Sequence, residues 1–328
     1  MTLDFTKFTI FLPVKNGGNY LHLCVESILT QSYPHFELVI LENKSTDGSQ
    51  EWLQALVQKD SRVKVIASNE SLSIEDNWKR ILTNTKNEFM TMIGHDDLLD
   101  RDFLEVINNS IIEEPNANLY FTHFRLIDSE GKVIRYCSPM PKHESAVNFL
   151  AARMGEIRDS FGTGYVMRST VYNKVGGILS FPNLLFADDA LWLQLIDSGV
   201  NVISSQVCFS YRLHSGSTSG KPDSKALFYG LKSYLNFLKE LLKENTEVAK
   251  AIKLYGPQYV ARRCQEYYCK ILRNVPWGKS VDEKELLEIK SILSEYAPEY
   301  MLDDKCLAYG RLPRAKYWVS SLIKEVLS

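Results

Sequence analysis

Residues 9–48 read TIFLPVKNGGNYLHLCVESILTQSYPHFELVILENKSTDG, and this stretch contains two strand-like apolar runs separated by a helix-like pattern. Residues 9–14 and 36–41 have the length and the apolar character of buried strands, whereas residues 20–31 repeat apolar side chains at helical spacing. Polar turn residues follow each strand, beginning with Asn16-Gly17-Gly18 after the first. A strand, a crossover helix and a second strand predict parallel pairing.

The same alternation continues beyond this stretch. Further strands are predicted at residues 63–67 and 89–93, each preceded by a helical pattern. Residues 119–136 predict a hairpin, which favours a partly antiparallel second half, and from about residue 225 the sequence is helical almost throughout. We therefore predict an α/β fold with a Rossmann-like, doubly wound mixed sheet in residues 1–222 and a helical C-terminal region in residues 223–328.

The composition is that of an ordinary globular protein. The 328 residues include 38 basic and 40 acidic ones, so the net charge is −2, and we expect no nucleic-acid partner because electrostatic binding to phosphates needs a basic excess. The six cysteines form no C-x-x-C pair, the N-terminus lacks the pattern of a signal peptide, and no apolar run is long enough to span a bilayer. These features predict a cytoplasmic protein that could act at the inner face of a membrane only from its surface.

Two acidic pairs and one histidine are candidates for chemistry. Asp96-Asp97 follow a predicted strand, Asp188-Asp189 begin a predicted helix, and His214 follows the strand expected at residues 202–213. Carboxylates at the end of a strand can hold a divalent cation that bridges the phosphates of a nucleotide. Helix capping would explain either acidic pair about equally well, and a lone histidine in a loop is usually solvated.

Four segments occur in an order that resembles the family 2 glycosyltransferases, which have the GT-A fold. They are PVKNGGNYLHLCVESILTQSYPHFELVILENKSTDGS at residues 13–49, GHDDLLD at 94–100, ADDALWLQL at 187–195 and YRLHSGSTS at 211–219. The resemblance covers about residues 8–220. It implies that residues 1–222 form a GT-A catalytic domain and that the helical region is an appendage to it.

The resemblance also implies where a nucleotide binds. In such enzymes the loop after the first strand contacts the nucleobase, and an acidic residue after the second strand accepts a hydrogen bond from it. The nucleotide-binding residues implied in this chain are Pro13, Val14, Asn16, Glu42, Asn77 and Asp96.

The acidic pairs receive separate roles from the same resemblance. Asp96 would hold Mn²⁺ or Mg²⁺, joined by His214 when its loop closes. Asp189 would be the catalytic base that deprotonates the acceptor hydroxyl, and Asp188 would orient the donor sugar or the acceptor. Direct attack with one base inverts the anomeric centre.

Some positions depart from the pattern of the family or fit it only in part. Glu42-Asn43-Lys44 stand where the family usually has Asp-Asp-Gly, and Gly94 replaces the first aspartate of its Asp-X-Asp motif. Asp76 occupies the place of an arginine that often precedes Asn77. Gly162 and Gly164 resemble the loop that lines the acceptor side, although a simple tight turn explains them at least as well.

The function implied is transfer of a sugar from a nucleotide-diphosphate sugar, with a UDP-sugar favoured, to a hydroxyl of a glycan or lipid-linked glycan acceptor in surface polysaccharide biosynthesis. A nucleotidyltransferase is the alternative enzyme, but the turn that begins at Asn16 lacks the basic residue expected of its phosphate loop. A non-catalytic sugar-nucleotide-binding assembly subunit is the alternative from another class. It would account for Gly94 but not for the retained Asp96 and Asp189.

The last residues of the chain carry a basic amphipathic pattern. RLPRAKYWVSSLIKEVLS, residues 311–328, places basic side chains beside aromatic and aliphatic ones, which suits peripheral contact with an anionic membrane surface. Packing on the catalytic domain, or on a second copy of the chain in a homodimer, is the more ordinary explanation of the same pattern.

Overall fold

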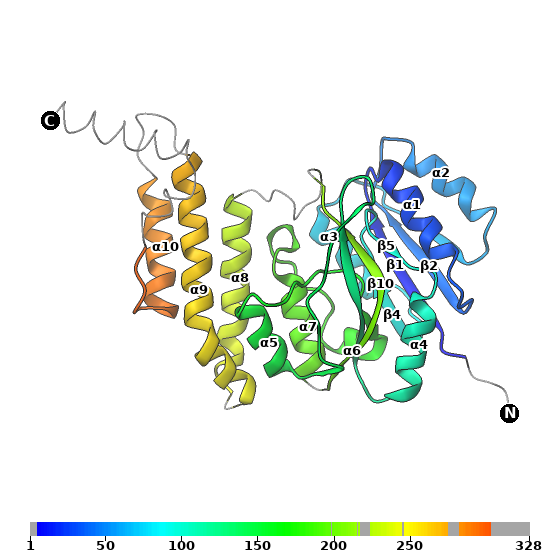
Figure 1. Cartoon of the computed structure of the whole chain (residues 1–328). Coiled ribbons are helices and arrows are strands. Elements are labelled where there is room, and N and C mark those ends of the chain that lie inside the picture. Colours follow the sequence, from blue (N-terminus) through cyan, green and yellow to red (C-terminus); the bar gives the residue numbers. More distant parts are fainter. Residues whose placement is uncertain are drawn as a thin grey trace.

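The computed structural model describes residues 5–197, 199–214, 216, 224–244, 246–274 and 282–302. Its first part alternates strands and helices in the order expected from the apolar pattern (Figure 1). These elements are β1 (Phe8–Val14), α1 (Gly18–Leu29), β2 (Phe36–Glu42), α2 (Ser49–Val57), β3 (Val63–Ala67), α3 (Ile74–Thr83), β4 (Phe89–Met92), β5 (Leu98–Leu99) and α4 (Phe103–Glu113).

The second part begins with the predicted hairpin and also contains short elements that the local pattern did not predict, among them β8, α5, β9 and α6. The elements are β6 (Leu119–Ile127), β7 (Val133–Tyr136), β8 (His143–Glu144), α5 (Ala146–Met154), β9 (Val166–Arg168), α6 (Ser169–Lys174), the 3-10 turn η1 (Pro182–Leu184), α7 (Ala187–Asp197) and β10 (Asn201–Arg212). Three helices follow, α8 (Ser224–Leu241), α9 (Glu247–Asn274) and α10 (Glu283–Tyr296).

Within the described residues the strands form one mixed sheet in the order β3-β2-β1-β4-β9-β6-β10-β5. The strands β3, β2, β1 and β4 are mutually parallel, and β10 is parallel to β6. Strand β9 is antiparallel to both β4 and β6, between which it lies. The predicted doubly wound mixed sheet is confirmed.

The central strands are buried on both faces. Every residue of β1 is buried, and in β2 only Glu37 is partly exposed. Because successive side chains of a strand point to opposite faces, a fully buried strand needs a covering layer on each side. This burial explains why these strands read as continuous apolar runs rather than as an alternation of apolar and polar residues.

The C-terminal helices pack on helical elements of the second part of the chain, with α9 against α5 and α8 against η1 and α7. Figure 1 shows α8, α9 and α10 side by side, with α8 next to α5 and α7 and far from α1 and α2. Buried side chains of α8 and α9 belong to the same apolar core as those of the sheet. The helical character predicted after residue 225 is therefore confirmed for these helices, while the domain boundary at residue 222 stays a prediction.

The basic amphipathic segment at residues 311–328 lies outside the described residues, and so does its predicted contact with a membrane or a second copy. In the described part of the chain, no helix combines the length and the apolar composition that crossing a bilayer requires.

Candidate active site

The loops after β1 and β2 lie against each other at the carboxyl edge of the parallel strands. The side-chain oxygen of Asn16 accepts a hydrogen bond from the backbone N–H of Thr46 at 2.8 Å, and the backbone N–H of Asn16 donates to Ser45 Oγ at 2.9 Å. The N–H of Gly18 donates to Asp47 Oδ2 at 2.9 Å. Desolvation raises the pKa of Asp47, but hydrogen bonds from Ser49 and from Gly18 outweigh it and keep that pKa below its usual value. In open α/β sheets this edge is where ligands bind.

Glu42 is the buried acid between these two loops. It pairs in register with Val14, which follows Pro13 at the end of β1, and its side chain is fully buried. Its Oε1 accepts the N–H of Ser45 at 2.6 Å, whereas its Oε2 has no hydrogen-bond partner among the residues that the structure describes. A buried carboxylate oxygen without a donor is costly, so an N–H group of a ligand that reaches this atom would remove that cost.

Two polar side chains of helix α3 form hydrogen bonds with the backbone of β2 at and next to Glu42. Asn77 is buried and donates to the carbonyl oxygen of Leu41 at 3.3 Å. Arg80 donates to Asn77 Oδ1 at 2.8 Å and to the carbonyl oxygen of Glu42 at 3.0 Å. Burial lowers the pKa of Arg80, and the charge of Glu42 opposes that shift. Arg80 was missed in the sequence, although its place three residues after Asn77 puts both on one helix face.

Asp96 and His214 are far apart in the sequence but in contact in the structure. His214 Nε2 lies 2.9 Å from Asp96 Oδ2, and both side chains remain partly accessible at 15% and 19%. The ring of Tyr20 lies 4.9 Å from the ring of His214. The two residues predicted to hold a metal are thus in direct contact, with a face open to solvent.

Asp97 and Arg212 lie beneath that pair and hold the loop in place. Asp97 is buried and accepts hydrogen bonds from Thr163 Oγ1 at 2.7 Å and from the backbone N–H of Arg212 at 3.0 Å. Burial and the neighbouring charge of Asp96 raise the pKa of Asp97 well above its usual value. The side chain of Arg212 donates to the carbonyl oxygens of Asp96 and Asp128 at 2.8 and 3.0 Å.

Gly94 makes room for the Asp96 carboxylate. A Cβ atom at position 94 would lie 2.8 Å from Asp96 Oδ1 and 3.3 Å from Asp97 Oδ2. Its carbonyl oxygen accepts a 3.5 Å contact from the buried Cys24 Sγ. The position where the family usually has an aspartate therefore has no space for a side chain in this arrangement.

Asp188 and Asp189 have different surroundings although they are adjacent. Asp189 is only 2% exposed, and its two oxygens accept hydrogen bonds from Arg153 Nε and Nη2 at 2.8 and 2.7 Å. Asp188 is partly exposed, and its Oδ1 accepts the N–H of Asp189 at 3.0 Å. Burial and the charge of Asp189 raise the pKa of Asp188 to about 7, against the lowering effect of Arg153.

The loop 161–164 connects Asp188 with the acidic loop after β4. A Cβ atom on Gly162 would lie 3.7 Å from Asp188 Cβ, and the next residue, Thr163, donates to Asp97. Gly164 has a φ of 80° and is packed so tightly on Phe209 that a Cβ atom would lie 2.8 Å from its ring. Gly162 therefore lies beside the acidic pair, whereas Gly164 is a tight turn buried against the sheet.

Asp96 and His214 fit a divalent cation shared with a diphosphate. No group of three or more His, Cys, Asp or Glu side chains in the described residues could hold a metal by itself. Mg²⁺ and similar ions are commonly bound by one or two protein side chains together with substrate phosphates and water. A carboxylate and an imidazole in contact at an open position match that donor set.

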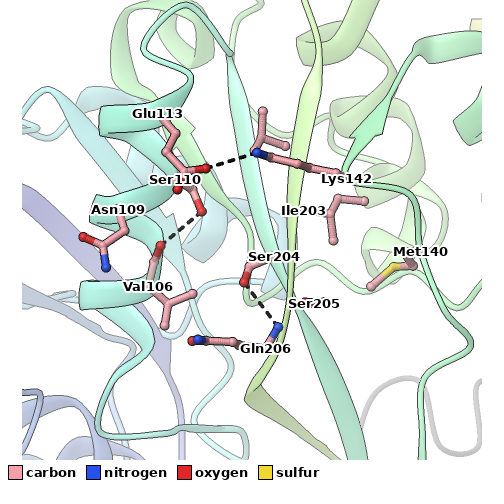
Figure 2. Close-up of a pocket in the computed structure, with 11 residues that line it drawn as sticks. Val106, Asn109, Ser110, Glu113, Met140, Lys142, Ile203, Ser204, Ser205 and Gln206 are labelled. Atoms are coloured by element: carbon pink, nitrogen blue, oxygen red, sulfur yellow. Dashed lines mark hydrogen bonds and ion pairs between the residues drawn. The ribbon is translucent and has the colours of Figure 1, made fainter.

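A separate cavity of about 360 Å³ lies away from these residues. Figure 2 shows that α4 and the first half of β10 line it, with an ion pair between Lys142 and Glu113 at its rim. The cavity and the acidic residues lie at different ends of β10, because the lining ends at Gln206 whereas Arg212, the last residue of the strand, contacts Asp97. None of the predicted site residues lines this cavity.

A mixed sheet of this order, with acidic side chains at the carboxyl ends of its parallel strands and helices after it, defines a GT-A type of transferase. The sequence signature described as Glycosyl transferase family 2 matches residues 9–175, and the chain belongs to this family.

Relatives and solved structures agree with that assignment. The chain is 26% identical over 213 residues to the putative teichuronic acid biosynthesis glycosyltransferase TuaG of Bacillus subtilis. This alignment covers 64% of the chain and 81% of TuaG. The match to the glycosyltransferase GlyA of Streptococcus pneumoniae, 32% identical over 126 residues, covers 38% of this chain and spans only 18% of GlyA.

Two solved structures share the fold. Residues 1–349 of S. aureus TarS in complex with UDP-GlcNAc superpose with a TM-score of 0.61 at 13% identity, covering 88% of this chain and 91% of that chain. The mannosyltransferase PcManGT from Pyrobaculum calidifontis, in complex with GDP-Man and Mn²⁺, gives a TM-score of 0.56 at 13% identity, covering 99% and 88%. The predicted GT-A fold with C-terminal helices is confirmed.

Proposed function

We propose that this chain is an inverting, metal-dependent glycosyltransferase that moves a sugar from a nucleotide-diphosphate sugar to a hydroxyl of a glycan or lipid-linked glycan. The observation that carries the proposal is the arrangement along one sheet edge. Glu42 lies at the proposed base-binding end, Asp96 after β4 contacts His214 after β10, and the loop 161–164 contacts Asp97 through Thr163 and lies beside Asp188 at Gly162.

The nucleobase binds at Glu42 in this proposal. Its unpartnered Oε2 needs an N–H donor, which uracil offers at N3 and guanine at N1, so both UDP-sugars and GDP-sugars fit the chemistry. We favour UDP-sugars, and TarS, one of the structures with this fold, is in complex with UDP-GlcNAc. Pro13, Val14 and Asn16 would line the nucleobase site next to Glu42. Asn77 would hold the Leu41 carbonyl group, one residue before Glu42, in place.

Asp96 and His214 would hold Mn²⁺ or Mg²⁺ together with the diphosphate. When bound there, such an ion neutralises the charge that develops on the leaving diphosphate. The protein contributes the placement: Arg212 holds the carbonyl of Asp96, and Tyr20 limits the movement of the His214 ring. PcManGT, which shares the fold, is in complex with Mn²⁺.

We assign the base to Asp188 rather than to Asp189, which was the residue expected from the sequence. Each oxygen of Asp189 already accepts a hydrogen bond from Arg153, and the side chain is almost fully buried, so little of it is exposed to an approaching acceptor hydroxyl. Asp188 is accessible, and its raised pKa makes it a stronger base. One base and direct attack on the anomeric carbon give inversion, so an α-linked donor yields a β-linked product.

A screen of nucleotide sugars tests the proposed function. With Mn²⁺ present, we expect release of UDP or GDP from one donor class and, with a suitable glycan acceptor, a product whose anomeric coupling in NMR shows inversion. Release of pyrophosphate from a nucleoside triphosphate and a sugar phosphate would instead indicate a nucleotidyltransferase. Absence of nucleotide binding with or without a metal would contradict the proposal.

The biosynthesis of a surface polysaccharide is the setting we propose. TuaG is described as a teichuronic acid biosynthesis glycosyltransferase, and most of its length matches this chain. Lipid-linked glycans and polysaccharide fragments are therefore the first acceptors to supply in the screen.

A further inference from the structure

The segment just before α7 has an unusual backbone. Asn183, Leu184 and Phe186 have φ angles of 52°, 56° and 65°, in the left-handed region that residues with a side chain rarely adopt. Residues in this region are strained and keep the conformation only where their surroundings hold it. Two residues later comes Asp188, so the strain lies directly beside the proposed base.

Helix α3 holds the first part of this segment. The backbone N–H of Asn183 donates to Glu75 Oε1 at 2.6 Å. Glu75 belongs to the first turn of the same helix that carries Asn77 and Arg80 below the nucleobase position. The contact therefore joins the nucleotide half of the site to the segment that leads to the base.

Helix α8 holds the last part of the segment. A Cβ atom on Gly230 would lie 2.8 Å from Leu185 Cβ and 3.0 Å from the Leu185 carbonyl oxygen, so the helix and the segment approach as closely as glycine permits. The ring of Phe186 stacks on that of Tyr234 with centroids 5.9 Å apart. These contacts place one of the C-terminal helices against the base-bearing end of α7.

We propose that residues 182–186 form a positioning strap that sets the place of Asp188 relative to the donor, with Glu75 and Gly230 as its positioning residues. This inference rests on the proposed function, because it gives the strap a role in that reaction. A rigid strap stretched between α3 and α8 fixes the base with respect to both. It also gives the C-terminal helices a catalytic purpose beyond packing.

Gly230→Ala tests the contact with α8. The added methyl group must push Leu185 aside, and a displacement of the base by about 1 Å is expected to lower kcat by about tenfold or more. The KM for the donor and the Kd for UDP should change less than about twofold, because the nucleotide residues lie on other elements. Asn236→Ala is the matched control: it is an exposed position of the same helix with a similar gain in helix propensity.

Glu75→Ala tests the other attachment without touching the core. It should lower kcat with little effect on the KM for the donor, whereas Glu75→Gln keeps an acceptor oxygen and should retain most of the activity. Glu51→Ala is the control, since Glu51 is also an exposed acid in the first turn of a helix. Equal kcat values for Glu75→Ala and Glu51→Ala would overturn the role of Glu75.

Hydrogen exchange separates failure of this inference from failure of the proposed function. Amides of residues 184–190 should exchange faster in Gly230→Ala and Glu75→Ala than in the wild type and the two controls. Unchanged exchange would overturn the strap whether or not transfer is detected. Transfer by the wild type together with unchanged kcat in both variants would overturn it while leaving the proposed function intact.

Discussion

Asp188 and Asp189 show how one step along a helix can separate two chemically identical groups. The Asp189 carboxylate points into the layer between α7 and α5, where Arg153 binds both of its oxygens. Asp188 is partly exposed, and its Cβ atom lies beside Gly162. The ion pair and the proposed base therefore depend on each other, because Arg153 balances the charge that would otherwise push the pKa of Asp188 higher.

Exchanging each acid for its amide separates the two roles. Asp188→Asn should lower kcat by about a thousandfold, a typical loss for a missing general base, while UDP binding measured by calorimetry stays unchanged. Asp189→Asn should instead lower the free energy of unfolding in urea by roughly 3 kcal/mol, because Arg153 loses its charged partner in a mostly buried place. A folded and stable Asp189→Asn without activity, beside an active Asp188→Asn, would restore Asp189 as the base.

The pH dependence of kcat should report Asp188. A base works in its ionised form, so kcat should rise with pH and level off above an apparent pKa of about 7. The sign for stability is opposite. Since the folded pKa exceeds the unfolded value of 3.8, this group lowers the free energy of unfolding as pH rises from about 4 to about 7. A flat kcat profile between pH 5.5 and about 8 would contradict the assignment.

Restoring the usual aspartate at position 94 should damage the site instead of improving it. Gly94→Asp, and even Gly94→Ala, adds a Cβ atom 2.8 Å from Asp96 Oδ1 and should force that carboxylate away from His214. We expect the binding of UDP in the presence of Mn²⁺ to weaken by about tenfold or more in calorimetry. Tighter binding in Gly94→Asp would show that the loop rearranges to use the second carboxylate.

At this scale the roles of the site residues stay predictions, and the structure adds their contacts. The family resemblance implied that Asp96 and His214 hold a metal together, and in the structure the two side chains are in contact. The difference between Asp188 and Asp189 depends on Arg153, which reaches them from another helix. No local pattern contains that contact, since it arises from the packing of α5 on α7.

Helix α3 has more to do in the site than its sequence suggested. Ser73 caps it by accepting the N–H of Asp76 at 3.1 Å, and its hydroxyl donates to Asp76 Oδ2 at 2.9 Å, so the acid that stands where the family often has arginine takes part in the cap. The next turn supplies Arg80, whose guanidinium connects Asn77 with the carbonyl of Glu42. The first turn of the helix therefore carries its cap, and the later turns carry the side chains that hold Glu42 at the proposed nucleobase site.

Arg80→Lys should separate charge from geometry in that support. Arg80 Nη1 donates to the Glu42 carbonyl oxygen and to Asn77 Oδ1, and its Nη2 donates to the Ile66 carbonyl oxygen. Lysine keeps the positive charge but lacks the planar fork that reaches all three acceptors. We expect UDP affinity in calorimetry to fall by about tenfold, the effect of losing one well-placed hydrogen bond near a charged group. Lys79→Ala, an exposed neighbour on the same helix, should leave it unchanged. Equal affinities of Arg80→Lys and the wild type would remove Arg80 from the site.

Long apolar runs were predicted well as elements, and short inserted strands were not. The β1, β2 and β4 runs are buried on both faces, so their composition alone distinguishes them from loops. The three residues of β9 carry no such signal. They form a strand because β4 and β6 offer hydrogen-bonding edges on both sides.

The described residues before and after position 222 share one apolar core, which bears on the boundary predicted there. Helix α8 buries Phe228, Leu231 and Tyr234, and α9 packs along α5. Arg262 and Arg263 of α9 pair with Glu156, which has a φ of 58° just after α5. The helical region covers α5 and α7 and is attached to them and to the loop after α5 through both apolar and charged contacts.

A chain that ends at residue 222 should therefore be less stable than the full chain. Exposing the faces of α5 and α7 that α8 and α9 cover should lower the midpoint of thermal unfolding and increase the binding of a hydrophobic dye. Scanning calorimetry of the full chain should show one cooperative transition. Two separate transitions, with a shortened chain that keeps its midpoint and binds UDP, would support an independent appendage.

The order of strands in the sheet also has a consequence for how the chain folds during synthesis. Phe89 of β4 pairs with Arg168 of β9, and Leu99 of β5 pairs with Phe209 of β10, so the centre and one edge of the sheet wait for residues made much later. Pairings distant in sequence close slowly, and until then β4 presents an open, apolar edge. A nascent chain that has only reached α4 should therefore be the form most in need of a chaperone.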